Sequence, residues 1–304
     1  MAFQRVVGIA SAVGGGERLR KGSATVGPAA LREALALGAA ALGGSSATPR
    51  LDAELLLAKA LGASRERLLF LTAGVGAEPV DLPPDLLSRY WQLLLRRQAG
   101  EPVAYIVGSR SFRRLDLAVD PRVLVPRPES ELLVEIGLSL PQGARVVDVG
   151  TGSGAIALAL KEERPDLEVV GTDKSLSALA VAWENAARLG LAVQFCQTDL
   201  LASVPPPDAV LCNPPYLPEG VPTPPELSYE PPEALFAGPD GLAVIRRLCG
   251  QLAALPEVKV AAIEFGSGQE RAVCRLLEGA GFTRTEVHRD LAGLPRVAVG
   301  RRDG

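Results

Sequence analysis

Beyond Ser130 the chain alternates short apolar runs with segments of helical periodicity, and this alternation restricts the possible folds more than any other feature. Five runs have the length and composition of buried strands: RVVDVG, EVVGTD, VQFCQTD, DAVLCN and VKVAAIEFG. Segments between most of them, such as AIALALKEE and SLSALAVAWENAARLG, have the periodicity of helices. Because parallel strands need crossovers that cover both faces of a sheet, we expect an α/β domain over residues 129–304. Two final runs, TRTEVHRD and RVAVG, predict an antiparallel addition.

The chain before this domain is organised differently. Within residues 28–100, three segments place apolar residues three and four positions apart: PAALREALALGAAALG, LDAELLLAKALG and LPPDLLSRYWQLLLRRQAG. They predict a small helical domain. Runs of β-forming residues around Tyr105 and Leu117 predict a β-hairpin that links the two domains over residues 101–128. Residues 1–27 are rich in Gly, Ala and Ser, make a poor signal peptide, and are expected to form a flexible extension.

Composition disfavours several classes of protein. With 304 residues and 47% hydrophobic content, the chain is long enough for two packed cores and too apolar to be disordered. Its formal net charge of -3 disfavours a broad surface for nucleic acid. No apolar run approaches the roughly 20 residues of a membrane helix, so no membrane partner is expected. Four cysteines without CxxC spacing and a single histidine, His288, argue against disulfides and metal sites and favour the reducing cytoplasm.

A glycine-rich turn follows the first expected strand of the α/β domain. VVDVGTGSGAIALAL places Gly150, Gly152 and Gly154 between a strand and a helix, where the backbone can pass close to a ligand. A tight structural turn and a dinucleotide site are both open alternatives, because the spacing is GxGxG and not GxGxxG. About 20 residues later, at the end of the next strand, Asp173 offers a carboxylate to a ribose diol. The pairing favours a cofactor of the adenosine type.

Two more expected strands end in polar residues, Asp199 and Asn213, so four successive strand ends form one rim for a ligand. Asn213 begins the sequence NPPY. The simplest interpretation of Asn-Pro-Pro is a turn, because proline lacks an amide hydrogen and restrains the residue before it.

These residues resemble the class I S-adenosylmethionine-dependent methyltransferases and, within them, the HemK/PrmC family of release factor glutamine methyltransferases. The resemblance extends from about Pro28 to the C-terminus, and its motifs are LDAELLL, GEPVAYIVG, PRPESELLVE, DVGTGSGAIALAL, NPPY, GPDGL and EFGSGQ. It implies a Rossmann-like, mostly parallel seven-stranded sheet. It also implies methyl transfer from S-adenosylmethionine, with S-adenosylhomocysteine as the product. The acceptor would be the side-chain nitrogen N5 of the glutamine in the GGQ motif of class 1 peptide chain release factors, as protein substrates in the cytoplasm.

The resemblance also implies roles for particular residues. The cofactor-binding set is Gly150, Thr151, Gly152, Ser153, Gly154, Asp173, Asp199, Leu200 and Asn213, with Asp173 on the ribose hydroxyls and Asp199 and Leu200 near the adenine. The catalytic set is Asn213, Pro214 and Tyr216, and the substrate-binding set adds Pro215 and Phe112. Three positions depart from the family. Leu200 stands where an aromatic residue is frequent, and Arg113 and Arg114 stand where relatives have an aromatic or small pair.

The implied methyl transfer to a glutamine amide explains why a loop with the sequence NPPY would be used. A glutamine amide nitrogen is a poor nucleophile because its lone pair is delocalised into the carbonyl, so an enzyme must fix its orientation. The side-chain carbonyl of Asn213 and the backbone carbonyl of Pro214 can accept both amide hydrogens. Pro215 stiffens the loop, and Tyr216 offers an aromatic face. The sulfonium already activates the methyl group, so no strong general base is expected.

Two other functions compete with this one. NPPY is shared with methyltransferases that act on amino groups of DNA or RNA bases, although the acidic, proline-rich loop VPTPPELSYEPPE is poorly suited to a nucleic acid. The other is a non-catalytic adapter with a vestigial cofactor fold, against which the intact glycines, Asp173 and NPPY argue.

Overall fold

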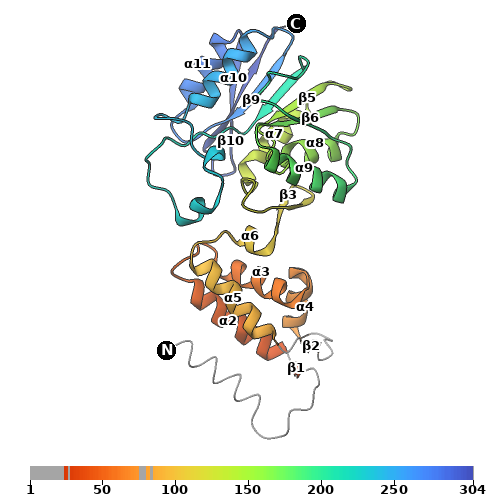
Figure 1. Ribbon diagram of the computed structural model, residues 1–304, viewed down its shortest axis with the longest axis vertical. Coiled ribbons are helices and arrows are strands. Elements are labelled where there is room, and N and C mark those ends of the chain that lie inside the picture. Colours follow the sequence, from red (N-terminus) through yellow and green to blue (C-terminus); the bar gives the residue numbers. More distant parts are fainter. Residues whose placement is uncertain (1–23, 27, 75–79, 83–84, 304) are drawn as a thin grey trace, which may run out of the picture. The chain divides into compact units, whose positions relative to one another are not determined.

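The computed structural model describes residues 24–26, 28–74, 80–82 and 85–303 (Figure 1). The chain forms two compact units, which divide between Ala99 and Gly100. The extension expected over residues 1–27 lies outside the described residues, apart from Ala24–Val26, which form a short strand.

The N-terminal unit is a helical bundle. Its elements are β1 (Ala24–Val26), α2 (Pro28–Leu42), α3 (Pro49–Leu61), α4 (Arg65–Ala73), β2 (Val80–Leu82) and α5 (Leu86–Gln98), with β1 antiparallel to β2. Buried leucines from these helices form its core: Leu35, Leu42, Leu56, Leu57, Leu68 and Leu94. A buried ion pair joins α5 to α3, because Arg97 Nε donates to Asp52 Oδ2 at 2.7 Å. The expected helical region is confirmed, and α4 adds a helix that the periodicity does not predict.

The second unit begins with the short helix α6 (Val103–Val107) and a hairpin of β3 (Ser109–Phe112) and β4 (Leu115–Ala118). The expected strand around Leu117 is confirmed, whereas the one around Tyr105 is wrong, because Tyr105 lies in α6. Packing outweighs β propensity there. The side chain of Tyr105 packs in a cluster with Val119, Val123 and Val125, and its hydroxyl donates to the carbonyl of Val123.

A seven-stranded sheet forms the centre of the second unit. Its strands are β5 (Arg145–Val149), β6 (Glu168–Asp173), β7 (Gln194–Gln197), β8 (Ala209–Cys212), β9 (Val260–Glu264), β10 (Arg284–Arg289) and β11 (Pro295–Arg301). Their order is β10-β11-β9-β8-β5-β6-β7. β11 runs antiparallel to both of its neighbours, β9 and β10, and all other pairs of strands are parallel, so the expected mostly parallel sheet is confirmed.

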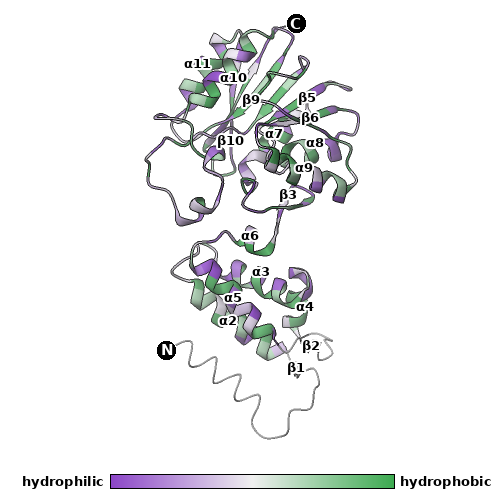
Figure 2. Cartoon of the chain, viewed as in Figure 1, coloured by the Kyte–Doolittle hydropathy of each residue, from purple (hydrophilic) through white to green (hydrophobic). Residues whose placement is uncertain are grey.

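Helices cover both faces of this sheet (Figure 1). On one side lie α7 (Glu131–Leu138), α8 (Ala155–Glu163) and α9 (Leu176–Leu189), and on the other α10 (Ala243–Ala253) and α11 (Glu270–Gly279). Successive strand residues point to opposite faces, so Val146 packs in the cluster with α7 and α8 while Val147 packs with α10 and α11. The outer helices carry both hydrophobic and hydrophilic residues (Figure 2), and no described helix is long and apolar enough to cross a membrane.

The connections between strands locate the ligand-binding edge. From β5 the chain continues to β6 and β7 on one side, and then returns to β8 on the other side of β5. In open parallel sheets, ligands bind at such a reversal, outside the carboxyl ends of the strands. Three short 3₁₀ helices lie in the connecting segments: η1 (Pro128–Ser130), η2 (Pro225–Tyr229) and η3 (Pro232–Ala234).

Candidate active site

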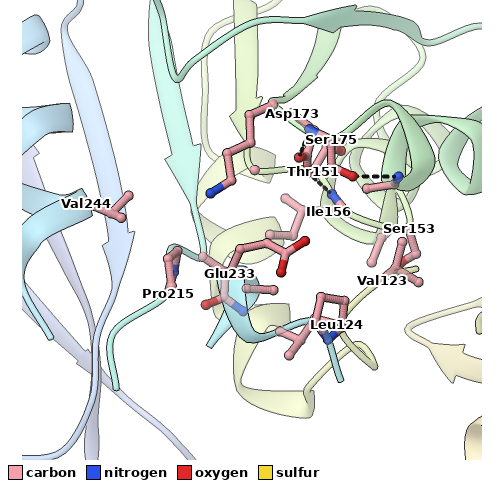
Figure 3. Close-up of a pocket in the computed structure, with 18 of the residues that line it drawn as sticks. Val123, Leu124, Thr151, Ser153, Ile156, Asp173, Ser175, Pro215, Glu233 and Val244 are labelled. Carbon is pink, nitrogen blue, oxygen red and sulfur yellow. Dashed lines mark hydrogen bonds between the residues drawn. The ribbon is translucent and has the colours of Figure 1, made fainter. Parts of the chain in front are cut away.

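A cavity opens at the carboxyl ends of the parallel strands, and most of the expected site residues line it. They are Phe112, Gly150, Thr151, Gly152, Ser153, Asp173, Asp199, Leu200, Asn213 and Pro215. Figure 3 shows Thr151, Ser153 and Asp173 on one side of the cavity and Pro215 and Val244 on the other. Three expected residues do not form its wall: Gly154, Pro214 and Tyr216.

The glycine-rich loop passes the cavity in a left-handed backbone conformation. Gly150, Gly152 and Gly154 have φ values of 72°, 55° and 82°, which residues other than glycine rarely adopt. The amides of Gly150 and Thr151 both donate to the carbonyl of Thr172 at 2.8 Å, which fixes the loop to β6. A Cβ at Gly154 would lie 2.9 Å from Leu158 Cδ1, so this glycine permits close packing at the start of α8. The loop therefore presents backbone without bulky side chains to a ligand.

Asp148 supports this loop and was missed by sequence reasoning. Its side chain is 1% exposed, and Oδ2 accepts hydrogen bonds from Thr151 Oγ1 at 2.6 Å and from the Ala157 amide at 3.2 Å. Among the described residues, Oδ1 has no hydrogen-bond partner. Burial raises the pKa of Asp148 to about 7. The sequence feature that could have identified Asp148 is a single acidic residue inside an otherwise apolar strand.

Asp173 stands at the end of β6 with both carboxylate oxygens held by backbone. Oδ2 accepts from the Gly152 amide at 3.0 Å, and Oδ1 accepts from the Ser175 amide at 2.9 Å. Burial raises its pKa, and these two hydrogen bonds oppose the shift. Each carboxylate oxygen has a second lone pair, so the group can still accept hydrogen bonds from a diol.

The segment after β7 contributes Asp199 and Leu200. The carboxylate of Asp199 forms an ion pair with Arg247 of α10, another residue of the cavity wall that sequence reasoning missed. Leu200 has a φ of 58°, a conformation that costs a non-glycine residue about 1 kcal/mol or more. Its carbonyl accepts a hydrogen bond from Thr172 Oγ1 at 3.2 Å, which ties the strained residue to β6. Leu200 thus supplies an apolar surface in place of an aromatic ring.

Asn213 and Tyr216 of the NPPY loop are tied to the end of β9. Asn213 Nδ2 donates to Ser130 Oγ at 2.9 Å, and Ser130 Oγ donates to Glu264 Oε2 at 2.7 Å. The hydroxyl of Tyr216 donates to Glu264 Oε1 at 3.3 Å. Tyr216 therefore turns toward Glu264, which explains why it does not line the cavity. Sequence reasoning missed Ser130 and Glu264, although both lie in the quoted motifs PRPESELLVE and EFGSGQ.

A buried carboxylate holds the proline-rich segment beside the cavity. Glu230 is 4% exposed and accepts hydrogen bonds from the Val125 amide at 2.9 Å and from Arg127 Nη2. The residues that follow it, Pro231 and Glu233, line the cavity, as Figure 3 shows for Glu233. The acidic loop is thereby fixed to the segment that follows the hairpin.

Arg113, one of the departures from the family pattern, anchors the hairpin. It lies at the turn with a φ of 50°, and its amide donates to Glu131 Oε1 at 3.2 Å. Its guanidinium donates to Glu163 Oε2 at 2.8 Å and also reaches Glu135. These contacts tie the turn to α7 and α8 and keep the neighbouring Phe112 at the cavity. Within the part of the chain that the structure describes, no hydrogen bond or ion pair of the Arg114 side chain accounts for that departure.

Comparison with known proteins identifies the family. Residues 33–108 match the model of the PrmC N-terminal domain, and residues 128–223 match that of the Methyltransferase small domain. The release factor glutamine methyltransferase of Burkholderia pseudomallei is 41% identical over 269 residues, which cover 84% of this chain and 92% of the relative. That of Mycolicibacterium smegmatis is 38% identical over 284 residues, which cover 90% and 98%. The chain belongs to the release factor glutamine methyltransferase family.

Membership of this family confirms the resemblance found in the sequence, and it makes the protein an S-adenosylmethionine-dependent methyltransferase. A solved structure of the hMettl16 catalytic domain in complex with MAT2A 3'UTR hairpin 6 has a TM-score of 0.52 and 15% identity. The match covers 72% of this chain and 82% of that one. This likeness shows the fold alone.

The residues of the cavity fit such a cofactor. The glycine-rich loop leaves room along its backbone, and Asp173 offers free lone pairs at the end of β6. Leu200 adds an apolar surface. Beneath the loop, Oδ1 of the buried Asp148 has no hydrogen-bond partner among the described residues, so it can still accept a hydrogen bond.

Proposed function

We propose that this protein methylates the side-chain nitrogen N5 of a glutamine in a peptide chain release factor. One observation carries the proposal. The Asn213 side chain is held through its nitrogen, because Nδ2 donates to Ser130, and its oxygen accepts no hydrogen bond from the described residues. Asn213 itself lines the cavity. An amide held in this way presents an unused acceptor to an incoming NH2 group.

The residues of the NPPY loop then have distinct roles. The oxygen of Asn213 and the carbonyl of Pro214 accept the two hydrogens of the substrate amide and fix the plane of its nitrogen. Pro215 stiffens the loop, and Phe112 forms part of the wall of the same cavity. Tyr216 supports the loop through its hydrogen bond to Glu264. After transfer, the alkylated amide is acidic enough to lose its proton without a strong base.

The geometry of the strand ends supports particular roles in cofactor binding. S-adenosylmethionine supplies an electrophilic methyl group on a sulfonium. We propose that Gly150, Thr151, Gly152 and Ser153 hold its amino-acid end along the loop, and that Gly154 acts indirectly by allowing α8 to pack. Asp173 accepts hydrogen bonds from the ribose, while Asp199 and Leu200 border the adenine.

We further propose that the helical domain, residues 28–100, recognises the release factor. The hairpin segment, residues 101–128, would link it to a catalytic domain over residues 129–304. The match of residues 33–108 to the PrmC N-terminal domain supports a family-specific role for this region. The relatives from Burkholderia pseudomallei and Mycolicibacterium smegmatis are release factor glutamine methyltransferases, which favours this substrate over nucleic-acid bases.

Mapping of the methylated residue tests the proposal. The protein is incubated with labelled S-adenosylmethionine and a purified release factor, and the labelled peptide is sequenced by mass spectrometry. We expect the label on the glutamine of the GGQ motif, and no label when that glutamine is replaced by alanine. Label on another residue, or transfer to nucleic acid alone, would refute the proposal.

A further inference from the structure

Behind the NPPY loop lies a hydrogen-bonded network of side chains that are far apart in the sequence. It runs from Asn213 through Ser130 to Glu264, and Tyr216 donates to the other oxygen of the same carboxylate. Ser130 is 3% exposed and Glu264 is 1% exposed. These residues come from the end of β8, from η1, from the end of β9 and from the NPPY loop, so the network forms only in the folded domain.

The ionisation of Glu264 determines the direction of every hydrogen bond in this network. An ionised carboxylate can only accept, so Ser130 must give its single hydroxyl proton to Glu264. The lone pairs of Ser130 Oγ then remain for a donor, and the group of Asn213 that faces Ser130 must be the NH2. The carbonyl oxygen of Asn213 is thereby turned away from Ser130. With Glu264 ionised, the chemistry of the three groups therefore allows only this orientation of the Asn213 amide.

Protonation of Glu264 removes this constraint. A neutral carboxyl can donate to Ser130, which can then give its own proton to the carbonyl oxygen of Asn213. In that arrangement the amide of Asn213 is rotated, and its NH2 faces the amide NH2 of the substrate. Two donors that face each other leave the nucleophile without its acceptor.

We propose that Glu264 and Ser130 are positioning residues, which orient the Asn213 amide so that its oxygen faces the substrate nitrogen. The inference rests on the proposed glutamine methylation and identifies two further residues that it requires. Neither residue is proposed to contact the cofactor or the reacting atoms. Their effect passes through Asn213 and, in the case of Glu264, also through Tyr216.

The surroundings of Glu264 place its ionisation in an accessible pH range. Burial raises its pKa to about 7, the negative charge of Glu129 acts in the same direction, and Ser130, Tyr216 and Arg296 oppose the shift. From the neighbouring strand β8, the thiol of Cys212 is neutral, because burial raises its pKa well above the ordinary value. Arg296 of β11 is paired mainly with Asp290 at 2.8 Å and lies 4.0 Å from Glu129.

The test measures single-turnover methylation of a release factor at saturating cofactor and protein substrate, as a function of pH. For the wild-type enzyme we expect the rate to fall as the pH decreases, with a midpoint well above the ordinary pKa of a carboxyl. In Glu264→Gln the amide can donate or accept, so Asn213 is no longer fixed. We expect a rate about 10- to 100-fold lower that no longer has this acid limb, with unchanged affinity for the cofactor.

Further variants separate positioning from general loss of structure. Ser130→Ala should lower the rate to a similar extent, whereas Ser130→Thr, which keeps the hydroxyl, should restore most of it even if the added methyl group lowers stability. Tyr216→Phe removes a hydrogen bond that lowers the pKa of Glu264, so its acid limb should move to higher pH. Asp166→Asn is the control, because it removes a carboxylate paired with Arg164 at the other end of β6. Its rate and pH profile should match those of the wild type.

The outcomes distinguish this inference from the proposed function. If the wild-type enzyme does not methylate the glutamine, the proposed function fails. If the wild type is active but folded Glu264→Gln and Ser130→Ala keep its rate and its acid limb, the inference is overturned. It is also overturned if Ser130→Thr is as slow as Ser130→Ala while both remain folded.

Discussion

Replacement of Asn213 by alanine separates the role of this residue in catalysis from its role in folding. The substitution removes the 2.9 Å hydrogen bond from Nδ2 to Ser130, while Ser130 keeps its acceptor at Glu264. A hydrogen bond between neutral groups contributes about 0.5–1.5 kcal/mol, so we expect the free energy of unfolding to fall by about 1 kcal/mol. The same change removes the acceptor that would orient the substrate amide. A misplacement of about 1 Å can cost about 100-fold in rate, or about 2.7 kcal/mol in activation free energy.

The assay is single-turnover methylation at saturating cofactor, combined with calorimetric measurement of cofactor affinity. We expect Asn213→Ala to lower the rate by about 100-fold and to leave the affinity for S-adenosylmethionine nearly unchanged. If the residue only ends a strand with a turn, the variant should lose stability and keep its activity per folded molecule. A near wild-type rate in folded protein would therefore refute the reasoning.

Asn213→Asp is a sharper form of the same experiment. The aspartate has the shape of asparagine but replaces the NH2 group that faces Ser130 with an acceptor. Ser130 has one proton, which it donates to Glu264, so only one of the two carboxylates can accept a hydrogen bond from Ser130. We expect the variant to bind the cofactor and to transfer the methyl group slowly, because the side chain turns or shares the proton of Ser130.

Three further predictions concern the cofactor, the stability and the domains. Asp173→Ala should weaken S-adenosylmethionine binding by about 1.5–3 kcal/mol in calorimetry, because a charged acceptor is lost, and an unchanged affinity would remove Asp173 from the site. Burial raises the pKa of Asp148 and Glu264 to about 7 each, so the folded protein holds protons that the unfolded chain releases above its ordinary carboxyl pKa values. The contribution of these two carboxyls to the free energy of unfolding should thus be largest below that range and fall as the pH rises to about 7, by on the order of 3 kcal/mol for Glu264. In denaturant titrations the difference in stability between the wild type and Glu264→Gln should therefore change over this pH range, and a constant difference would contradict this. A chain that begins near Gln98 should still bind the cofactor but methylate an intact release factor poorly, and full activity on that protein would exclude recognition by residues 28–100.

The sheet could be predicted from the sequence because its signals are local. The strands β5, β8 and β9 are short apolar runs, and the period of two assigns alternate residues to the two covered faces. Helix α6 could not be predicted in this way. Its residues VAYIV have high β propensity, and their helical state depends on packing with Val119, Val123 and Val125, which come later in the chain.

The residues of the candidate site also differ in whether the sequence alone can predict them. The glycines and Asn213 follow directly after strands and Asp173 is the last residue of one, so topology alone brings them to one edge of the sheet. Their supporting partners are not adjacent in sequence, since Ser130 lies 83 residues before Asn213 and 134 residues before Glu264. A buried glutamate and a serine carry no periodic signal, and their function depends on which hydrogen bonds the fold allows. Sequence reasoning could therefore find the proposed acceptor for the substrate amide, but only the structure shows the buried carboxylate that we propose determines which way this acceptor points.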